Sequence, residues 1–400
     1  MNQPITEQNV RKIPTSSIIS QMLMGSTYAS DLILSPFQAP HVRLNGQLFQ
    51  VKVSDIEKFS AEDTARIAGD LIGSNQLAER RLKEEGACDV SYSIPKLARF
   101  RVNIFTQRGT YAIVMRVIPT NIPEITSLNL PSQLSEIAEL KSGVVLVTGS
   151  TGSGKSSTVA ALLNLINEKK AYHIVTIEDP IEFSHTHKES IVHQRELHTD
   201  TPRFDIALRA VLRQSPDVIL VGEMRDRETI EIVLEAAETG HLVFSTLHTI
   251  DASSTLERII GVFPLGDQQP IRNRFAKSFR YIISQRLIPR KLNNGRVAAL
   301  EILKSTLRTQ QYVIKGENEG KTLLDAMRDG TTEGMQYFDG EIEKLVRKDV
   351  IDFETGIQFA TNPGNLRLEM ADLVEKPETY VSTTSNEGEL EIERCSSPKT

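Results

Sequence analysis

The sequence contains only two cysteines, Cys88 and Cys395, among its 400 residues. So few cysteines exclude a disulfide-stabilised scaffold and any zinc module that needs four of them. Long apolar runs are also missing: the longest, such as Val144–Val147 and Ala160–Leu163, are far shorter than the roughly 18 residues of a membrane-spanning helix. Residues 1–12 are polar and lack the apolar stretch of a secretory signal. We therefore expect a soluble, cytoplasmic protein.

The sequence also lacks an excess of positive charge. Its 46 basic and 52 acidic side chains give a net charge of −6, which argues against a nucleic-acid-binding protein that depends on bulk positive charge. Hydrophobic residues make up 39% of the chain and charged residues 24%, as in an ordinary globular protein. At roughly 100–200 residues per domain, the length predicts two to four domains.

The first part of the chain, residues 1–118, has the pattern of a small α+β domain. Helical spacing of apolar residues predicts one helix over 60–84. Alternation of apolar and polar residues predicts short strands before this helix, at 31–34, 42–44 and 48–53. The same alternation predicts longer strands after the helix, within 87–117, with Gly109 marking a hairpin. Residues 119–134 hold three prolines and few helical signals, and are expected to be a linker.

Residues 135–373 show a different pattern, in which apolar strands alternate with helices. The predicted strands are 144–148, 173–177, 218–221 and 242–247, and the predicted helices 156–168, 204–213 and 227–239. Continuously apolar strands separated by helices predict an α/β fold, with a parallel sheet covered on both faces. Beyond residue 252 the chain is expected to be mostly helical. Residues 374–400 are rich in Ser, Thr and Glu and are expected to form a disordered tail.

Residues 149–156 match the phosphate-binding loop pattern G-x-x-x-x-G-K-[ST], between a predicted strand and a predicted helix. Glycines let backbone N–H groups turn toward phosphate at a helix N-terminus. Lys155 is expected to be solvated until it meets the β- and γ-phosphates, and the Ser156 hydroxyl to ligate Mg²⁺. We therefore predict ATP and Mg²⁺ as cofactors, with the nucleotide held by Gly149, Ser150, Thr151, Gly152, Ser153, Gly154, Lys155, Ser156 and Ser157.

Carboxylates follow two further predicted strands. Glu223 ends the apolar segment 217–223, and an acid at the tip of the strand next to the phosphate loop commonly holds Mg²⁺, together here with Ser156. The strand 173–177 runs into Glu178, Asp179 and Glu182. Unpaired buried charge is costly, and ligands bind at this edge of open α/β sheets. One of these acids can orient the attacking water, although a solvated acidic turn is also consistent with the sequence.

Two histidines, His241 and His248, flank the predicted strand 242–247. A histidine at a strand end is often structural or exposed. His248, however, stands at the carboxyl end of a third strand of the same sheet, where it could donate to a γ-phosphate. His185 and His187 are expected to be surface residues.

The order of these segments resembles that of the type II/IV secretion ATPase superfamily. Four segments are similar to its Walker A, aspartate-box, Walker B and histidine-box motifs, in that order: residues 149–156, 176–183, 213–226 and 239–249. The resemblance implies that Glu182 is the catalytic glutamate and Glu223 the Walker B acid. It also implies that His241 and His248 are the histidine-box residues.

Within that superfamily the chain is most similar to the twitching-motility retraction ATPases of type IV pili, the PilT and PilU group. The similar segments are Ala29–Leu32, Ala98–Asn103, Gly334–Asp339 and Asn365–Leu368. The four-cysteine zinc insertion of the pilus assembly ATPases is missing. Ser284–Arg290 and Gly295–Ala298 are closer to PilU, and a segment typical of PilT is matched only loosely by Lys315–Lys321. The sequence therefore does not distinguish a PilT-type from a PilU-type retraction ATPase.

The resemblance implies an N-terminal PAS-like domain joined to a RecA-like ATPase core with a helical C-terminal part. Such proteins are Mg²⁺-dependent ATP hydrolases that work as homo-hexameric rings, alone or mixed with a paralogous retraction ATPase. The implied partner is an inner-membrane pilus platform protein. The ring would sit at the cytoplasmic face of that membrane, attached only through partners, and would bind no nucleic acid.

Arg101 and Arg116 lie 15 residues apart on two strands joined near Gly109, so a hairpin would bring them together. The resemblance implies that they reach the γ-phosphate of a neighbouring subunit, as arginine fingers do; solvated arginines on an exposed hairpin are the alternative. Two other functions also stay open. One is a secretion or conjugation motor of the same superfamily, and the other is an accessory subunit that binds ATP with low turnover.

Overall fold

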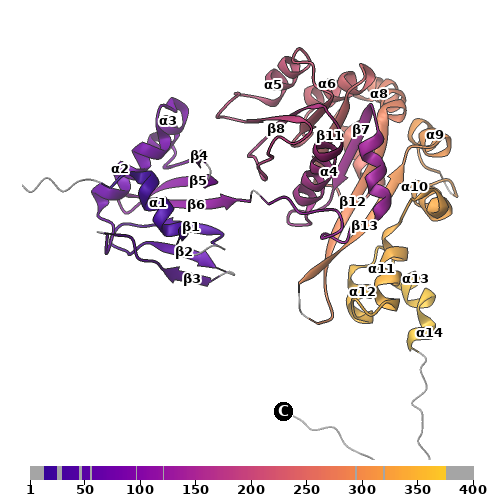
Figure 1. Ribbon diagram of the computed structural model, residues 1–400. Coiled ribbons are helices and arrows are strands. Elements are labelled where there is room, and N and C mark those ends of the chain that lie inside the picture. Colours follow the sequence, from indigo (N-terminus) through magenta and orange to yellow (C-terminus); the bar gives the residue numbers. More distant parts are fainter. Residues whose placement is uncertain are drawn as a thin grey trace, which may run out of the picture.

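The computed structural model describes residues 13–24, 29–44, 47–54, 56–95, 97–119, 121–292, 295–318 and 320–374. Two sheets organise these residues. A six-stranded sheet has the order β3-β2-β1-β6-β5-β4, and a seven-stranded sheet has the order β13-β12-β7-β11-β10-β8-β9. Figure 1 shows them as two bodies, each with its own helices, joined by the segment that follows β6. The predicted mixed α/β fold is confirmed.

The N-terminal body is an antiparallel sheet packed against three helices. Its strands are β1 (Asp31–Leu34), β2 (His41–Leu44), β3 (Gln47–Gln50), β4 (Ala87–Ile94), β5 (Ala98–Gln107) and β6 (Thr110–Ile118), and its helices are α1 (Thr15–Met24), α2 (Ala61–Ile72) and α3 (Gln76–Glu84). Fully buried Ile18, Ile67 and Phe100 belong to one apolar cluster between the helices and the sheet. This packing sets the position of the β5–β6 hairpin.

Two sequence predictions for this body were wrong in detail. The single helix expected over 60–84 is interrupted, because Gly73 has a left-handed φ of 56° and the Asn75 side chain caps a new helix by accepting from Ala78 N at 3.0 Å. The strand expected to reach Val53 ends at Gln50. The hairpin at Gly109, with a φ of 76°, is confirmed.

The second body contains a largely parallel sheet. Its strands are β7 (Gly143–Thr148), β8 (His173–Glu178), β9 (Ile191–Glu196), β10 (Val218–Val221), β11 (Leu242–Leu247), β12 (Phe279–Pro289) and β13 (Arg296–Lys304), and the first helices are α4 (Lys155–Lys169), α5 (Phe204–Val211), α6 (Arg227–Glu238), α7 (Ala252–Gly261) and α8 (Leu265–Ser278). Val145 and Val147 share a core with α4, whereas Val144 and Leu146 share one with α5–α8. Both faces are covered, as predicted.

The expectation of a mostly helical chain after residue 252 was wrong over 279–304. Here β12 extends the sheet parallel to β7, and β13 pairs antiparallel with β12. Most residues of both strands are buried. A strand with two buried faces has no alternation, so periodicity cannot separate it from a buried helix.

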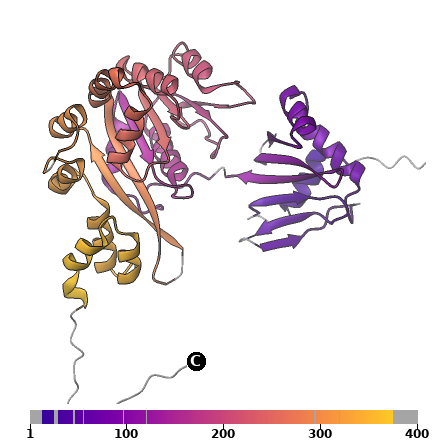
Figure 2. The ribbon, with the colours of Figure 1, turned by 180° about the vertical axis from the view of Figure 1, so that it is seen from behind.

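The rest of the C-terminal part is helical. It consists of α9 (Leu307–Lys315), α10 (Leu323–Asp329), η2 (Gly330–Glu333), α11 (Phe338–Arg347), α12 (Phe353–Phe359), α13 (Pro363–Glu369) and α14 (Ala371–Val374). Ile288 and Val297 of the β12–β13 pair lie in one apolar cluster with α11, α12 and α13, the yellow group at the end of the molecule in Figure 2. Apart from Val374, the predicted tail at 374–400 lies outside the described residues. Among the described helices, none has the length and hydropathy to cross a bilayer.

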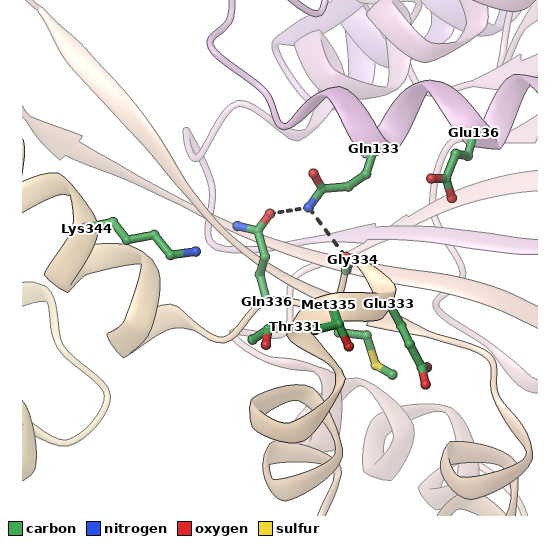
Figure 3. Close-up of a pocket in the computed structure, with 9 residues that line it drawn as sticks. Gln133, Glu136, Thr331, Glu333, Gly334, Met335, Gln336 and Lys344 are labelled. Atoms are coloured by element: carbon green, nitrogen blue, oxygen red, sulfur yellow. Dashed lines mark hydrogen bonds between the residues drawn. The ribbon is translucent and has the colours of Figure 1, made fainter.

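The segment predicted as a linker, residues 119–134, is irregular up to the short helix η1 (Ser132–Glu139). Ile125, Leu130 and Leu134 are buried in the core beside α4. Gln133 of η1 donates through Nε2 to Gln336 Oε1 at 2.6 Å and to Gly334 O at 3.4 Å, as Figure 3 shows. The second half of this segment is therefore packed on the second body.

Candidate active site

Four parallel strands, β7, β11, β10 and β8, end at one edge of the seven-stranded sheet. A cavity of about 740 Å³ lies there. Its lining combines phosphate-loop residues with side chains that follow the other strands, namely Thr151, Gly152, Gly154, Lys155, Ser156, Ser157, Glu178, Asp179, Glu182, Glu223 and His248. The structure thus brings most of the predicted site residues together.

The phosphate loop needs glycine at particular positions. Gly149, Gly152 and Gly154 have φ angles of 143°, 79° and 89°, values that residues with a Cβ rarely adopt. A Cβ at Gly149 would also lie 2.5 Å from the Gln285 carbonyl oxygen, and one at Gly154 2.7 Å from Gln285 Nε2. Helix α4 begins directly after the loop at Lys155, so its N-terminal N–H groups face the cavity edge where an anion would bind.

Lys155 is only 8% exposed, so the expectation of a solvated lysine was wrong. Its Nζ donates to Gly149 O at 2.8 Å and to Ser150 O at 3.0 Å. Burial lowers the pKa of this ammonium, and the charge of Glu223 partly opposes that effect. Two backbone carbonyls of the phosphate loop therefore hold the Lys155 ammonium in place.

His248 lies between the phosphate loop and Glu223. Its Nδ1 is 3.5 Å from both Lys155 Nζ and Thr151 Oγ1, and its Nε2 is 3.5 Å from Glu223 Oε2. Glu223 Oε2 is also paired with an Arg225 guanidinium nitrogen at 2.7 Å, which raises the pKa of Arg225. Arg225 was not among the predicted site residues.

Glu223 follows the predicted strand, β10, but this strand does not lie next to the phosphate-loop strand as expected. The sequence predicted an acid on the strand adjacent to the phosphate loop, but β11 lies between β7 and β10. The side chain still reaches the cavity, because all three strands end at the same edge. The adjacent strand, β11, instead leads to His248.

The acidic turn after β8 contains carboxylates in two different environments. Glu178 is buried, which raises its pKa to about 7, and it accepts from Thr176 Oγ1 at 2.7 Å and Gln194 Nε2 at 3.1 Å. Asp179 and Glu182 are exposed on the cavity wall. A carboxylate that orients water has to be accessible to that water. Glu182 meets this requirement better than Glu178 does.

The structure places two further histidines differently with respect to the cavity: His241 lies away from it and His185 lines it. His241 stands at the amino end of β11, where its Nδ1 contacts Ala236 O at 2.9 Å. The six residues of β11 separate it from the cavity edge by about 20 Å, so it does not reach the cavity of its own chain. His185 was expected on the surface, but it lines the cavity, and burial lowers its pKa to about 4. His187 is exposed, as expected.

The two arginines predicted on the hairpin face each other, with Arg101 opposite Arg116 on β5 and β6. Arg116 lines the cavity of its own chain, and its Nε is 3.0 Å from Asp31 Oδ1. Arg101 is exposed and is not among the described residues that line the cavity. The proximity of the pair is confirmed, but only one member reaches this site.

Gln285 of β12 is a site residue that sequence analysis missed. Its buried side chain donates through Nε2 to Ser153 O at 2.8 Å and accepts through Oε1 from Thr158 Oγ1 at 2.7 Å. It therefore joins the phosphate loop to the first turns of α4. No local pattern could have shown this, because Gln285 is 132 residues from Ser153 and lies in a part of the chain that was expected to be mostly helical.

We expect Gln285→Leu to weaken ATP binding about 5- to 100-fold. The substitution leaves a buried carbonyl and a buried hydroxyl without their partners, which costs about 1–3 kcal/mol and loosens the loop. Titration with a fluorescent ATP analogue measures the effect. Gln269→Leu, on the exposed side of α8, is the matched control and should bind normally. Unchanged affinity in folded Gln285→Leu would show that the loop holds its shape without this contact.

A second cavity, of about 440 Å³, lies between η1 and residues 331–336 (Figure 3). Polar side chains line it, including Gln133, Glu136, Gln336 and Lys344. Neither the phosphate loop nor any of the strand-end carboxylates contributes to it. The cavity at the sheet edge is therefore the candidate active site.

A nucleoside triphosphate suits the residues at the sheet edge. Three left-handed glycines, the N-terminus of α4 and Lys155 together favour a polyanion. Ser153 Oγ is buried with no hydrogen-bond partner among the described residues, so it is an unused donor inside this loop. Ser156 and Glu223 offer hard oxygen ligands of the kind that Mg²⁺ takes alongside phosphates and water.

The chain was compared with known families and structures. The family described as Type II/IV secretion system protein matches residues 14–358. Over 327 residues the chain is 42% identical to a twitching motility protein of Neisseria gonorrhoeae, covering 82% of this chain and 85% of that protein. It is 36% identical over 371 residues to the type IV pilus ATPase PilU of Pseudomonas aeruginosa, and the match covers 92% of this chain and 95% of that protein.

A solved structure is similar over almost the same length. The crystal structure of the pilus retraction motor PilT with bound ADP superposes with a TM-score of 0.78 at 39% identity, covering 89% of this chain and all of that one. These similarities confirm the family that the motifs predicted. With its phosphate loop and strand-end carboxylates at one sheet edge, the chain belongs to the Type II/IV secretion system protein family and is one of its ATP-hydrolysing motor enzymes.

Proposed function

We propose that this protein is the ATPase motor of type IV pilus retraction in twitching motility. The observation that carries the proposal is similarity to a pilus retraction motor along nearly the whole chain, 39% identity over 89% of it. That similarity includes both bodies, and the cavity that would bind ATP has Arg116 of the N-terminal body in its wall.

In the proposed reaction, Lys155 and the loop N–H groups hold the β- and γ-phosphates. Mg²⁺, ligated by Ser156 and Glu223, would neutralise phosphate charge when bound. Glu182 orients the attacking water, and His248, between Lys155 and Glu223, senses the γ-phosphate. Arg101 supplies positive charge to the cavity of a neighbouring subunit, and Arg116 supplies it either there or to the cavity of its own chain, whose wall it lines.

The mechanical part of the proposal assigns residues 1–118 to a PAS-like domain, 119–134 to a linker and 135–373 to the RecA-like motor. Six copies form a ring, alone or with a paralogous retraction ATPase, and nucleotide binding and release become rigid-body rotations of one domain against another. The ring acts on an inner-membrane platform protein from the cytoplasmic face.

A clean deletion of the gene, scored for surface pili and twitching, tests this function. Hyperpiliated, non-motile cells are expected, because extension would continue without retraction. Loss of protein secretion with normal motility would instead assign the chain to a secretion or conjugation motor of the same family.

A second candidate function is an accessory subunit with low turnover of its own. The observation in its favour is the match to PilU, which covers 92% of this chain, more than the 82% covered by the twitching motility protein. Steady-state ATP hydrolysis by the purified protein discriminates between the two. Turnover that rises only after a second retraction ATPase is added would favour the accessory role.

We expect Arg101→Ala and Arg116→Ala rings to bind ATP yet hydrolyse it poorly. If the arginines act across subunits, mixing Arg101→Ala with Lys155→Ala subunits should restore part of the activity, because some interfaces then pair an intact loop with an intact arginine. Hydrolysis across a series of mixing ratios measures this. If mixed rings form but recover nothing at any ratio, Arg101 does not act across subunits.

A further inference from the structure

Glu196, the last residue of β9, is a buried carboxylate that joins the two bodies. It is 4% exposed. From the N-terminal body, Ser91 Oγ of β4 and Arg99 of β5 donate to it, the latter from a guanidinium nitrogen 3.0 Å from Oε2. From the second body, the backbone N–H of Ile181 donates to the same Oε2 at 3.3 Å. One side chain thus touches both the N-terminal body and the acidic turn.

Two side chains of β9, two residues apart in the strand, form hydrogen bonds with the turn that carries Glu182. Gln194 donates to Phe183 O at 2.9 Å and accepts from His185 N at 2.8 Å. Glu196 accepts from Ile181 N, one residue before Glu182. Residues two apart on a strand point to the same side, so both side chains act on one face of the turn. Of the two, Glu196 is the one whose described partners include the N-terminal body.

Because Glu196 is buried, the loss of any of its hydrogen-bond donors would be costly. A desolvated carboxylate needs donors, and removing one partner of a buried pair is strongly unfavourable. If the N-terminal body moved away, Glu196 would keep Ile181 N and Thr199 Oγ1 (3.5 Å) but lose its charged donor. These two long contacts do not replace the lost cation, so the carboxylate would turn toward water and would then give up Ile181 N as well. Docking of the N-terminal body and the geometry of the turn therefore favour each other.

The contact is also suited to being broken. Arg99 Nε is buried without a hydrogen-bond partner among the described residues, so the guanidinium is not fully satisfied in the docked arrangement. Part of the favourable charge interaction is offset by that unpaired donor. A contact of this kind can form and break during a working cycle.

We propose that Glu196 is a positioning residue that couples docking of the N-terminal body, through Ser91 and Arg99, to the catalytic geometry of Glu182. The inference rests on the proposed role of Glu182 in hydrolysis. It adds a route within one chain by which movement of the N-terminal body switches the acidic turn between an aligned and a relaxed arrangement.

The test uses the full-length protein and variants remote from the cavity. Arg99→Gln should lower kcat about 2- to 30-fold, the range typical of residues that couple sites, with KM and nucleotide affinity within twofold of wild type. Ser91→Ala should shift kcat in the same direction, and Arg99→Lys should restore part of the loss. Ser93→Ala, two residues further along β4 and exposed, is the matched control and should change nothing.

A double mutant separates coupling from general destabilisation. Glu196→Gln should lower kcat in the wild-type background but add little in the Arg99→Gln background, because the two residues act through one contact. Full additivity, or wild-type kcat in both Arg99→Gln and Ser91→Ala, would overturn the inference. The Glu182→Gln variant is measured in the same assay. Normal turnover in that variant would overturn the proposed role of Glu182 and not the coupling through Glu196.

Discussion

Lys155→Ala will lose nearly all ATPase activity, by at least about 10²–10³-fold, while the protein stays folded. The lysine is the cation of the phosphate loop, and its Nζ contacts are to loop carbonyls rather than to the apolar core. Removing it takes away charge that stabilises the transferring phosphoryl group. Steady-state hydrolysis with a thermal unfolding measurement checks both halves of the expectation.

Lys169→Ala is the control for this result. Lys169 is exposed at the other end of the same helix, α4, and its loss should leave hydrolysis unchanged. If the purified Lys155→Ala protein hydrolyses ATP at the wild-type rate, the loop at 149–156 is not the active site and the proposed function fails with it.

Glu182→Gln will bind ATP normally and hydrolyse it about 10²–10⁴-fold more slowly, the range for loss of a positioned acid–base group. The amide keeps the size of the side chain but cannot accept a proton from water, so bound ATP should accumulate. Single-turnover hydrolysis and nucleotide binding, measured separately, show the two effects. Glu189→Gln, exposed nearby in the same segment, should behave as wild type.

Glu223→Gln should differ from Glu182→Gln. Its carboxylate is proposed to lie on the Mg²⁺ side of the site, so the variant should need more Mg²⁺ for half-maximal activity. Near-normal turnover in Glu182→Gln would move the water-orienting role to another acid of the turn. Asp179 would then be the better candidate, because it is exposed, whereas Glu178 is buried and bonded to Thr176 and Gln194.

The parts of the site that could be predicted are local in sequence. The loop at 149–156 and the acids after β8 and β10 follow from short patterns whose chemistry depends on neighbours along the chain. The order of strands in a parallel sheet is not local, so the insertion of β11 between β7 and β10 could not be predicted. His241 and His248 belong to one motif, but strand β11 separates them, so only His248 lies at the cavity edge.

The residues that sequence analysis missed act through contacts between distant segments. Gln285 supports the phosphate loop from 132 residues further along the chain, and Arg99 meets Glu196 across a separation of 97 residues. Neither belongs to a motif with its partner. The strand containing Gln285 also lies in a part of the chain that was expected to be mostly helical, because a strand buried on both faces lacks the alternation that indicates a strand.

The two carbonyl contacts of Lys155 limit which ligands can bind in the loop. Whatever draws the ammonium away from Gly149 O and Ser150 O must offer it acceptors at least as strong. Phosphate oxygens do so through charge-assisted bonds, which are roughly twice as strong as neutral ones. A nucleoside, or a base alone, offers nothing in exchange and leaves the lysine where it is. The loop therefore selects its ligand by the anionic charge of the phosphate chain before any contact with the base is made.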